Sequence, residues 1–337
     1  KYRVESEALD KYAQETSSTP EFVDWQGHDF SMRGMAGLES AVLSASGHLL
    51  SFTGTDTIPS IDFLEEYYNA DSDNDLIGGS VAATEHSVMC MGTNSGEEET
   101  FKRLITEVYP NGIVSIVSDT WDLWKVLTEY LPNLKEEVLQ RDGKVVIRPD
   151  SGDPVDIICG ENRNLGGNST KDKGVVELLW DVFGGTVNEQ GFKVLNSKVG
   201  TIYGDSITTD RAEEICKRLF DKGFASTNVV LGIGSFTYQF NTRDTFGFAM
   251  KATSVVVNGK RREIFKDPIT DDGIKKSAKG LLKVEFRNNE YILVDEVSEN
   301  EEKEGELMVI YKNGQFFNQT SLEEIRARIN KNISDEI

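Results

Sequence analysis

The sequence predicts an α/β fold whose strands form a parallel sheet or barrel, and three observations lead to this prediction. Short runs of aliphatic or β-branched residues recur along the chain, and each run ends in a small polar cluster. Most clusters follow one another at intervals of roughly 30 residues, the length of a strand and a helix that return to a parallel strand. Segments with the apolar periodicity of an amphipathic helix fill the intervals.

The predicted strands and their polar clusters follow in order along the chain. They are 48–52 with 54–57, a short run before 85–87, 113–117 with 118–120, 144–147 with 148–152, 199–203 with 204–206, and 229–231 with 232–235. The carboxyl ends of parallel strands lie at one edge of a sheet or barrel, where α/β enzymes place their sites. We therefore expect the clusters to share one pocket.

Helices are predicted where apolar residues recur on one face. The chain opens with such a segment, in which Leu9 and Ala13 share a side. Later segments of this kind are 97–109, 120–139 and 210–220. In the last of them Asp210 stands three residues before Glu213, the spacing of a capping box. The polar stretch 159–172 is predicted to be a surface loop.

The pattern changes after about Phe246, where hairpins replace the strand and helix units. Asn258–Gly259 and Asn313–Gly314 are dipeptides that favour tight hairpin turns, and strand-like runs flank each of them. A final amphipathic helix is predicted from Ser321, and the acidic stretch 295–306 is predicted to be a solvated loop. A second structural unit therefore begins here.

The composition indicates a folded, acidic protein. The 337 residues are 38% hydrophobic and carry a formal net charge of -21, which opposes binding to nucleic acid or to anionic membranes. No run approaches the roughly 18 apolar residues of a membrane span, and the first residues do not resemble a signal peptide. Cys90, Cys159 and Cys216 fit neither a disulfide framework nor a zinc site. We expect a soluble cytoplasmic protein with reduced thiols.

His86 is the strongest single candidate for chemistry. Imidazole titrates near neutrality, so His86 between Glu85 and Ser87 could move protons, accept phosphate or bind a metal. Carboxylates at strand ends suit acid–base catalysis, hydroxyl binding or magnesium ligation, and the candidates are Asp119, Asp150 and Asp205. Solvated or capping roles are the structural alternatives for these side chains.

Further groups suit a phosphorylated or heterocyclic ligand. Gly232–Ser235 lets backbone N–H groups approach an anion, although it also fits a tight turn. Phe30 and Arg33 combine an aromatic face with a guanidinium, which suits a flat heterocycle beside phosphate; a place in the core is the alternative for the ring. Basic residues in the hairpin region suit diphosphate or an ordinary surface, and they are Arg243, Lys251, Arg261, Arg262 and Lys266.

Taken in order, the clusters resemble nicotinamide phosphoribosyltransferase, of the type II phosphoribosyltransferase family. The matching motifs are His28-Asp29-Phe30-x-x-Arg33-Gly34, Gly54-Thr55-Asp56-Thr57, Glu85-His86-Ser87, Ser118-Asp119, Ile147-Arg148-Pro149-Asp150-Ser151-Gly152, Gly204-Asp205 and Lys266-Asp267-Pro268. The resemblance covers nearly all of this chain but only the later, larger part of the family's length. The chain also opens at Lys1 instead of Met, so we expect an amino-terminal portion before it.

The resemblance implies an irregular β/α barrel over 21–247 beside a second, mixed α/β domain formed by 1–20, 248–337 and the upstream portion. The implied reaction transfers phosphoribosyl from 5-phosphoribosyl 1-diphosphate to nicotinamide, giving nicotinamide mononucleotide and diphosphate in the first step of NAD salvage. Mg²⁺ is implied as cofactor and ATP as coupling substrate. A homodimer with shared active sites is the implied assembly.

The resemblance also implies a role for each motif residue. His86 would accept a phosphoryl group from ATP, with Asp119 orienting it. The residues implied to hold nicotinamide are Phe30, Asp56, Ser115 and Arg148. Those implied for ribose and phosphate are Arg33, Asp150, Gly204, Asp205, Gly234 and Ser235, with Mg²⁺ on the diphosphate and on Asp150 or Asp205. Those implied for diphosphate are Lys266 and, from the partner subunit, Arg243 and Lys251.

Asp56 is implied to decide which base is used. A buried carboxylate accepts a hydrogen bond from an amide but repels the carboxylate of nicotinate. Two departures affect the phosphate site: Gly234-Ser235-Phe236 stands where vertebrate members have Gly-Gly-Gly, and Ala249 replaces a hydroxyl residue. The family's aromatic that covers nicotinamide from the partner subunit is expected before Lys1. The alternatives are a nicotinate phosphoribosyltransferase and a truncated, non-catalytic module that binds nucleotide or protein.

Overall fold

The computed structural model describes residues 2–17, 19–161, 169–239, 249–267 and 277–320. Its internal contacts divide the chain into two units. Unit 1 comprises residues 1–252 and 264–277, and unit 2 comprises residues 253–263 and 278–337. The two units are described separately.

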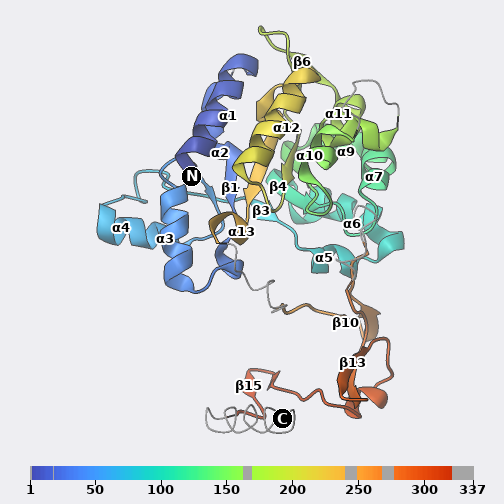
Figure 1. Cartoon of the computed structure of the whole chain (residues 1–337). Coiled ribbons are helices and arrows are strands. Elements are labelled where there is room, and N and C mark those ends of the chain that lie inside the picture. The colour runs from blue at the N-terminus through green and yellow to red at the C-terminus, as the bar shows by residue number, and fades with distance from the viewer. Residues whose placement is uncertain (1, 18, 162–168, 240–248, 268–276, 321–337) are drawn as a thin grey trace. The chain divides into compact units, whose positions relative to one another are not determined.

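Unit 1 is built on a curled, seven-stranded sheet that forms half of a barrel, and Figure 1 labels its strands β1, β3 and β4. In spatial order the strands are β2 (Gly54–Thr55), β1 (Gly27–Asp29), β9 (Val229–Ile233), β8 (Val199–Tyr203), β5 (Asp142–Arg148), β4 (Asn111–Val117) and β3 (Ala82–Ala83). All neighbouring strands in this order pair in parallel. The predicted α/β class is therefore confirmed.

Helices connect the parallel strands, as crossover connections require, and α1, α2 and α13 lie before β1 or after β9. The longer ones are α1 (Tyr2–Thr16), α3 (Leu38–His48), α4 (Pro59–Tyr68), α11 (Thr170–Phe183) and α12 (Thr209–Asp221). The shorter ones are α2 (Val23–Gln26), α5 (His86–Met91), α6 (Glu97–Arg103), α7 (Leu123–Lys125), α8 (Leu131–Asn133), α9 (Lys135–Gln140), α10 (Pro154–Cys159) and α13 (Ser235–Tyr238). The first helix, α1, packs along α12 (Figure 1), and an antiparallel hairpin of β6 (Gly185–Val187) and β7 (Lys193–Leu195) precedes β8.

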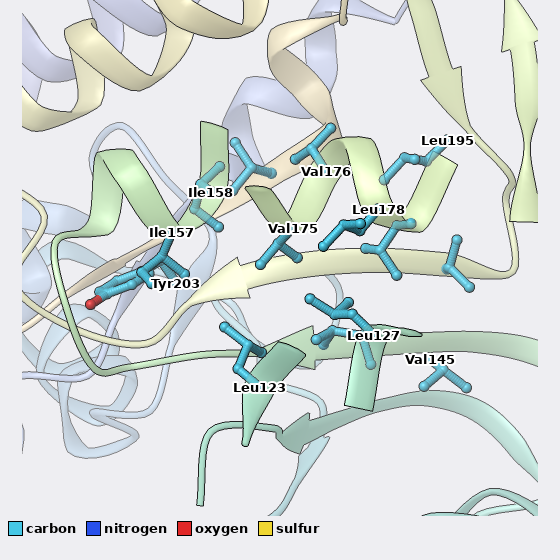
Figure 2. Close-up of a cluster of buried hydrophobic side chains, with 14 of the residues drawn as sticks. Leu123, Leu127, Val145, Ile157, Ile158, Val175, Val176, Leu178, Leu195 and Tyr203 are labelled. Carbon is cyan, nitrogen blue, oxygen red and sulfur yellow. The ribbon is translucent and has the colours of Figure 1, made fainter. Parts of the chain in front are cut away.

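The core of unit 1 lies where helices pack on the central strands. Figure 2 shows Ile157 and Ile158 of α10 and Val175 of α11 pointing toward the strands that carry Val145 and Tyr203. Burial of a Val, Leu or Ile side chain stabilises the fold by about 1.5–3 kcal/mol relative to exposure. This packing holds β4, β5 and β8 together, and their ends carry the polar clusters.

The strand predicted at 48–52 is wrong. Helix α3 continues to His48, a turn follows, and β2 contains only Gly54 and Thr55. The N–H of Phe52 donates to the carbonyl of His48, and the buried His48 ring bonds the Gly54 carbonyl through Nε2, at 2.9 Å. A short apolar run cannot tell a strand from the end of a buried helix, which is why the pattern misled.

Two helix predictions need correction in detail. The segment predicted as one helix over 120–139 is divided into α7, a π-helical turn at Val126–Tyr130, α8 and α9. Helix α12 is capped by Thr208, whose hydroxyl accepts from the N–H of Arg211, and not by a capping box that starts at Asp210. A capping box does occur where α11 begins, between Ser169 and Asp172.

The described part of unit 2 consists of hairpins and irregular segments. The two predicted hairpins are present as β10 (Ser254–Val257) with β11 (Lys260–Glu263), and β14 (Tyr311–Lys312) with β15 (Gln315–Phe316). A third hairpin, β12 (Lys283–Arg287) with β13 (Glu290–Val294), was not predicted. Its turn residues, Asn288 and Asn289, both have positive φ, as a type I′ turn requires. The helix predicted from Ser321 lies outside the described residues.

Three further expectations concern the cysteines, membrane-spanning helices and the domain boundaries. Cys90, Cys159 and Cys216 are buried free thiols, as predicted. Within the described ranges, no helix is both long and apolar enough to span a membrane. The predicted domain boundaries at 21 and 247 stay a prediction, although α1 packs on α12 of unit 1.

Candidate active site

The carboxyl ends of β3, β4 and β5 bring His86, Asp119 and Asp150 together. His86 is the first residue of α5, just after β3, while Asp119 and Asp150 follow β4 and β5. Nε2 of His86 lies 3.0 Å from Oδ1 of Asp150 and 3.9 Å from Oδ1 of Asp119. The N–H of Asp150 donates to Oδ2 of Asp119, at 3.0 Å. Three clusters that are far apart in the sequence thus meet at one edge of the sheet.

The contacts of His86 define two proton arrangements of the ring. When Nε2 carries the proton, it donates to Asp150, and the Thr120 hydroxyl, 3.1 Å away, donates to Nδ1. When Nδ1 carries the proton, it donates to Thr120 and leaves a lone pair on Nε2. The Nζ atom of Lys266 lies 3.3 Å from Nε2 and can donate to that lone pair. The ring can therefore present a nucleophilic nitrogen beside an ammonium group.

Asp119 is a fully buried carboxyl group behind this pair. Burial raises the pKa of Asp119, the negative charge of Asp150 raises it further, and His86 works in the opposite direction. Among the described residues, Oδ1 of Asp119 has no hydrogen-bond partner. The group is thus fixed on one oxygen by the Asp150 backbone and faces His86 with the other.

Lys266 reaches the cluster because two contacts anchor Phe265, the residue before it. Burial raises the pKa of the Cys90 thiol to about 11, so it stays protonated and donates to the Phe265 carbonyl, at 2.7 Å. The ring of Trp121 meets that of Phe265 edge-on, with centroids 4.7 Å apart. The predicted diphosphate residue Lys266 therefore lies beside His86, with Nζ 3.9 Å from Oδ1 of Asp150.

A second group of predicted residues lies near the ends of β1 and β5, and we call this group the ring slot. The guanidinium carbon of Arg148 lies 5.1 Å from the centroid of the Phe30 ring. Ser115 and Arg148 project from the same face of the sheet, because Arg148 pairs with Val117, two residues after Ser115. Oγ of Ser115 and Nε of Arg148 are buried and have no partner among the described residues. Such atoms suit a polar ligand.

Asp56 follows β2 and belongs to the same neighbourhood. Its Oδ1 accepts hydrogen bonds from Nε2 of His28, at 2.9 Å, and from the Ser80 hydroxyl, at 2.6 Å. Burial raises the pKa of Asp56, but these hydrogen bonds and the charge of Arg148 outweigh it, so the pKa is lowered. The carboxylate is therefore ionised at neutral pH.

The predicted phosphate residues lie along the ends of β1, β8 and β9. Arg33 pairs with Glu85, the residue before His86, at 3.1 Å, and both side chains are exposed. A Cβ atom on Gly34 would collide with the Ser235 hydroxyl, and one on Gly234 would collide with Oδ1 of Asp205. Glycine is needed at both positions because neighbouring strand ends approach so closely.

Gly204 lies close to a residue of each group. A Cβ atom there would lie 3.0 Å from Nε of Arg148 and 3.0 Å from the Cβ of Asp150. A larger residue at position 204 would therefore press on both groups of candidate residues.

Some predicted residues are not gathered here. Lys251 is exposed in an irregular segment of unit 1, and Arg243 lies outside the described residues. Arg261 belongs to unit 2, where it pairs with Glu299 at 3.1 Å.

The sequence patterns missed the partners of the candidate residues. Thr120 and Ser80 bind His86 and Asp56, yet a lone Ser or Thr carries no signal of its own. The bond between His28 and Asp56 could have been suspected, because each stands in a predicted polar cluster at a strand end.

A metal ion is compatible with part of this site. The nearest ligand atoms of His86, Asp119 and Asp150 all lie within 4.8 Å of one another. Mg²⁺ prefers oxygen ligands, however, and Lys266 already supplies positive charge next to the imidazole. Asp150 and Asp205, the residues predicted to hold Mg²⁺, follow the paired strands β5 and β8.

Comparison with known proteins agrees with this geometry. The model of the nicotinate phosphoribosyltransferase (NAPRTase) family matches residues 25–315. The chain belongs to this family. A protein of Acinetobacter baylyi named nicotinamide phosphoribosyltransferase is 54% identical over 331 residues, which are 95% of this chain and 64% of that protein. Proteins of the same name from Mycoplasma pneumoniae and Xanthomonas campestris are 44% and 34% identical, over 78% and 94% of this chain.

Family membership confirms the resemblance predicted from the strand-end motifs. The chain spans 64% of the length of the Acinetobacter relative and 55% of that of the Mycoplasma pneumoniae relative. The family match includes the clusters around Phe30, Asp56, His86, Asp150 and Lys266.

Proposed function

We propose that the protein transfers the phosphoribosyl group of 5-phosphoribosyl 1-diphosphate to nicotinamide, giving nicotinamide mononucleotide and diphosphate. Family membership supports the reaction type, and the names of the relatives support nicotinamide as the acceptor. The observation that carries the proposal is the ring slot. It combines an aromatic face, buried polar atoms without partners and the ionised Asp56.

The slot favours a neutral amide over an acid. The ring of nicotinamide would stack on Phe30, and its carboxamide N–H would donate to Asp56. The carboxylate of nicotinate would instead lie beside the Asp56 carboxylate in a partly desolvated site, and this repulsion would weaken its binding. Arg148 and Ser115 would then bind the carboxamide oxygen through the buried Nε and Oγ atoms.

Asp150 and Asp205 are proposed to bind the ribose and to hold Mg²⁺ with the diphosphate. A Cβ atom on Gly204, the residue before Asp205, would lie 3.0 Å from the Cβ of Asp150, so the two strand ends are close together. When bound, Mg²⁺ would neutralise charge on the leaving diphosphate. The carboxylates themselves would favour positive charge that develops on the ribose ring as the bond to diphosphate breaks. Arg33, Gly234 and Ser235 would bind the 5′-phosphate.

His86 is proposed to accept a phosphoryl group from ATP. Attack by Nε2 on the γ-phosphorus would form the N–P bond as the P–O bond to ADP breaks. The proton stays on Nδ1, which donates a hydrogen bond to the Thr120 hydroxyl oxygen, and Lys266 balances the charge of the phosphoryl group. Hydrolysis of this phosphohistidine would couple ATP to nucleotide synthesis.

The remaining parts of the proposal concern assembly and setting. Arg243 and Lys251 would reach the diphosphate of a partner subunit in a homodimer with shared sites. The net charge of -21 argues against nucleic acid and anionic membranes as partners, which fits a role on small metabolites in the cytoplasm.

Nicotinate is the second candidate acceptor, and the description of the family favours it. The two candidates differ at Asp56, because a nicotinate site needs a donor or a cation where this chain has an ionised carboxylate.

Incubation with 5-phosphoribosyl 1-diphosphate, Mg²⁺, ATP and nicotinamide tests the proposal. We expect nicotinamide mononucleotide to form, and [γ-³²P]ATP to label the parent protein but not a His86→Ala variant. A folded protein that binds nicotinamide yet forms no product would support the non-catalytic alternative. Equal labelling of the variant would exclude His86 as the acceptor.

A further inference from the structure

The carboxylate of Asp56 is held by only one of its two oxygens. Oδ1 accepts from His28 at 2.9 Å and from Ser80 at 2.6 Å, whereas Oδ2 accepts nothing from the residues that the structure describes. The Asp56 side chain is 44% exposed, so packing alone does not fix its orientation. Its direction therefore depends on the two donors to Oδ1.

His28 is the more rigid of these donors. Its side chain is only 11% exposed, and its ring contacts that of Phe30 at a tilt of 36°, with centroids 4.4 Å apart. A Cβ atom on Gly54 would lie 2.6 Å from Nδ1 of His28, so the ring occupies space that only glycine leaves open. Because Asp56 is ionised and can only accept, Nε2 of His28 carries the proton of this bond. Ser80, by contrast, is an exposed residue whose hydroxyl can turn to water.

We propose that His28 is a positioning residue that sets base selectivity by fixing the Asp56 carboxylate through the bond between Nε2 and Oδ1. The bond leaves Oδ2 as the acceptor for a neutral carboxamide and as the repelling charge for an acid. Without this bond Asp56 can turn toward solvent or toward Arg148, whose positive charge already lowers the pKa of Asp56. The slot would then lose its repulsion toward nicotinate and keep the guanidinium that attracts it.

Calorimetric titration of the chain with nicotinamide and with nicotinate tests this inference, which rests on the proposed function. We expect His28→Leu to reduce the ratio of the two affinities by about tenfold, the effect of losing one charge-assisted hydrogen bond. His28→Gln should retain most of the parent ratio, because its amide N–H can reach the position of Nε2. His28→Asn, which is too short to reach Asp56, should behave like His28→Leu and replaces it if the leucine variant does not fold.

His48→Gln is the matched control. His48 is also a buried histidine near β2, but its Nε2 bonds the Gly54 carbonyl, so the affinity ratio should not change. If folded His28→Leu or His28→Asn keeps the parent ratio of affinities for nicotinamide and nicotinate, the proposed role of His28 is wrong, whereas the proposed function is unaffected. A parent chain that binds neither base would contradict the nicotinamide slot itself, and with it this inference.

Discussion

Nε2 of His86 lies 3.0 Å from Oδ1 of Asp150 but 3.9 Å from Oδ1 of Asp119. Asp119 is the carboxylate that the family resemblance assigns to orient His86. Asp150 is thus the direct partner of the imidazole. Asp119 acts behind it by accepting the N–H of Asp150. The two aspartates that the sequence suggests for separate roles therefore form one chain of contacts to His86.

Replacement of Asp150 should slow phosphorylation of His86. In Asp150→Ala the imidazole loses the side chain that orients its ring, and Lys266 loses a carboxylate 3.9 Å from its Nζ, so we expect the rate of labelling by [γ-³²P]ATP to fall about tenfold or more. Asp205→Ala is the control, because Asp205 also follows a strand but has no contact with His86 among the described residues. Equal rates in parent and Asp150→Ala would show that this contact is not used.

A methyl group at Gly204 should impair both pockets without unfolding the sheet. In Gly204→Ala the new Cβ atom would press on Arg148 and Asp150, each 3.0 Å away, and we expect kcat/KM to fall about tenfold or more. Gly200→Ala lies in β8, just before Gly204; its Cβ atom would meet side-chain carbons of Lys144 at 3.4 Å and Val146 at 3.9 Å, so the variant should stay within about twofold of the parent. Steady-state kinetics measures both, and similar losses in the two variants would contradict the account.

Glu97 should make the protein less stable as the pH rises. This first residue of α6 is 1% exposed, and burial followed by the charges of Asp122 and Asp119 raises its pKa to about 8. The ordinary pKa is 4.5, so between these values the folded state holds a proton that the unfolded state has lost. The free energy of unfolding therefore falls as the pH rises through this window.

Urea denaturation at pH 5 and pH 8 measures this effect. Glu97→Gln cannot ionise, so its stability relative to the parent should increase between the two pH values by on the order of 3 kcal/mol. Glu99→Gln changes an exposed residue of the same helix and should show no such increase. A constant difference between Glu97→Gln and the parent would mean that Glu97 ionises normally.

The gathering of the His86 cluster could be predicted from the sequence because topology alone brings strand ends together. His86, Asp119 and Asp150 each follow a strand, and parallel pairing of β3, β4 and β5 places them at one edge whatever the details of packing. The hairpins at Asn258 and Asn313 were equally predictable, because their turns need residues that tolerate positive φ.

Contacts that depend on tertiary packing could not be predicted in this way. No spacing in the sequence indicates that Cys90 holds Phe265 and so brings Lys266 to His86, across 180 residues. The apolar run after His48 predicts that this residue starts a strand. In the structure His48 ends a helix, and its buried ring bonds the Gly54 carbonyl. Burial lowers the pKa of His48 to about 4, which makes it a neutral structural residue.

The central claim is that Asp56 selects nicotinamide, and the kcat/KM values for nicotinamide and nicotinate in the parent and in Asp56→Asn test it most directly. We expect the parent to prefer nicotinamide by on the order of a hundredfold, and the asparagine variant to lose most of that preference because the repelling charge is gone. A parent protein that uses nicotinate as well as nicotinamide would contradict the account.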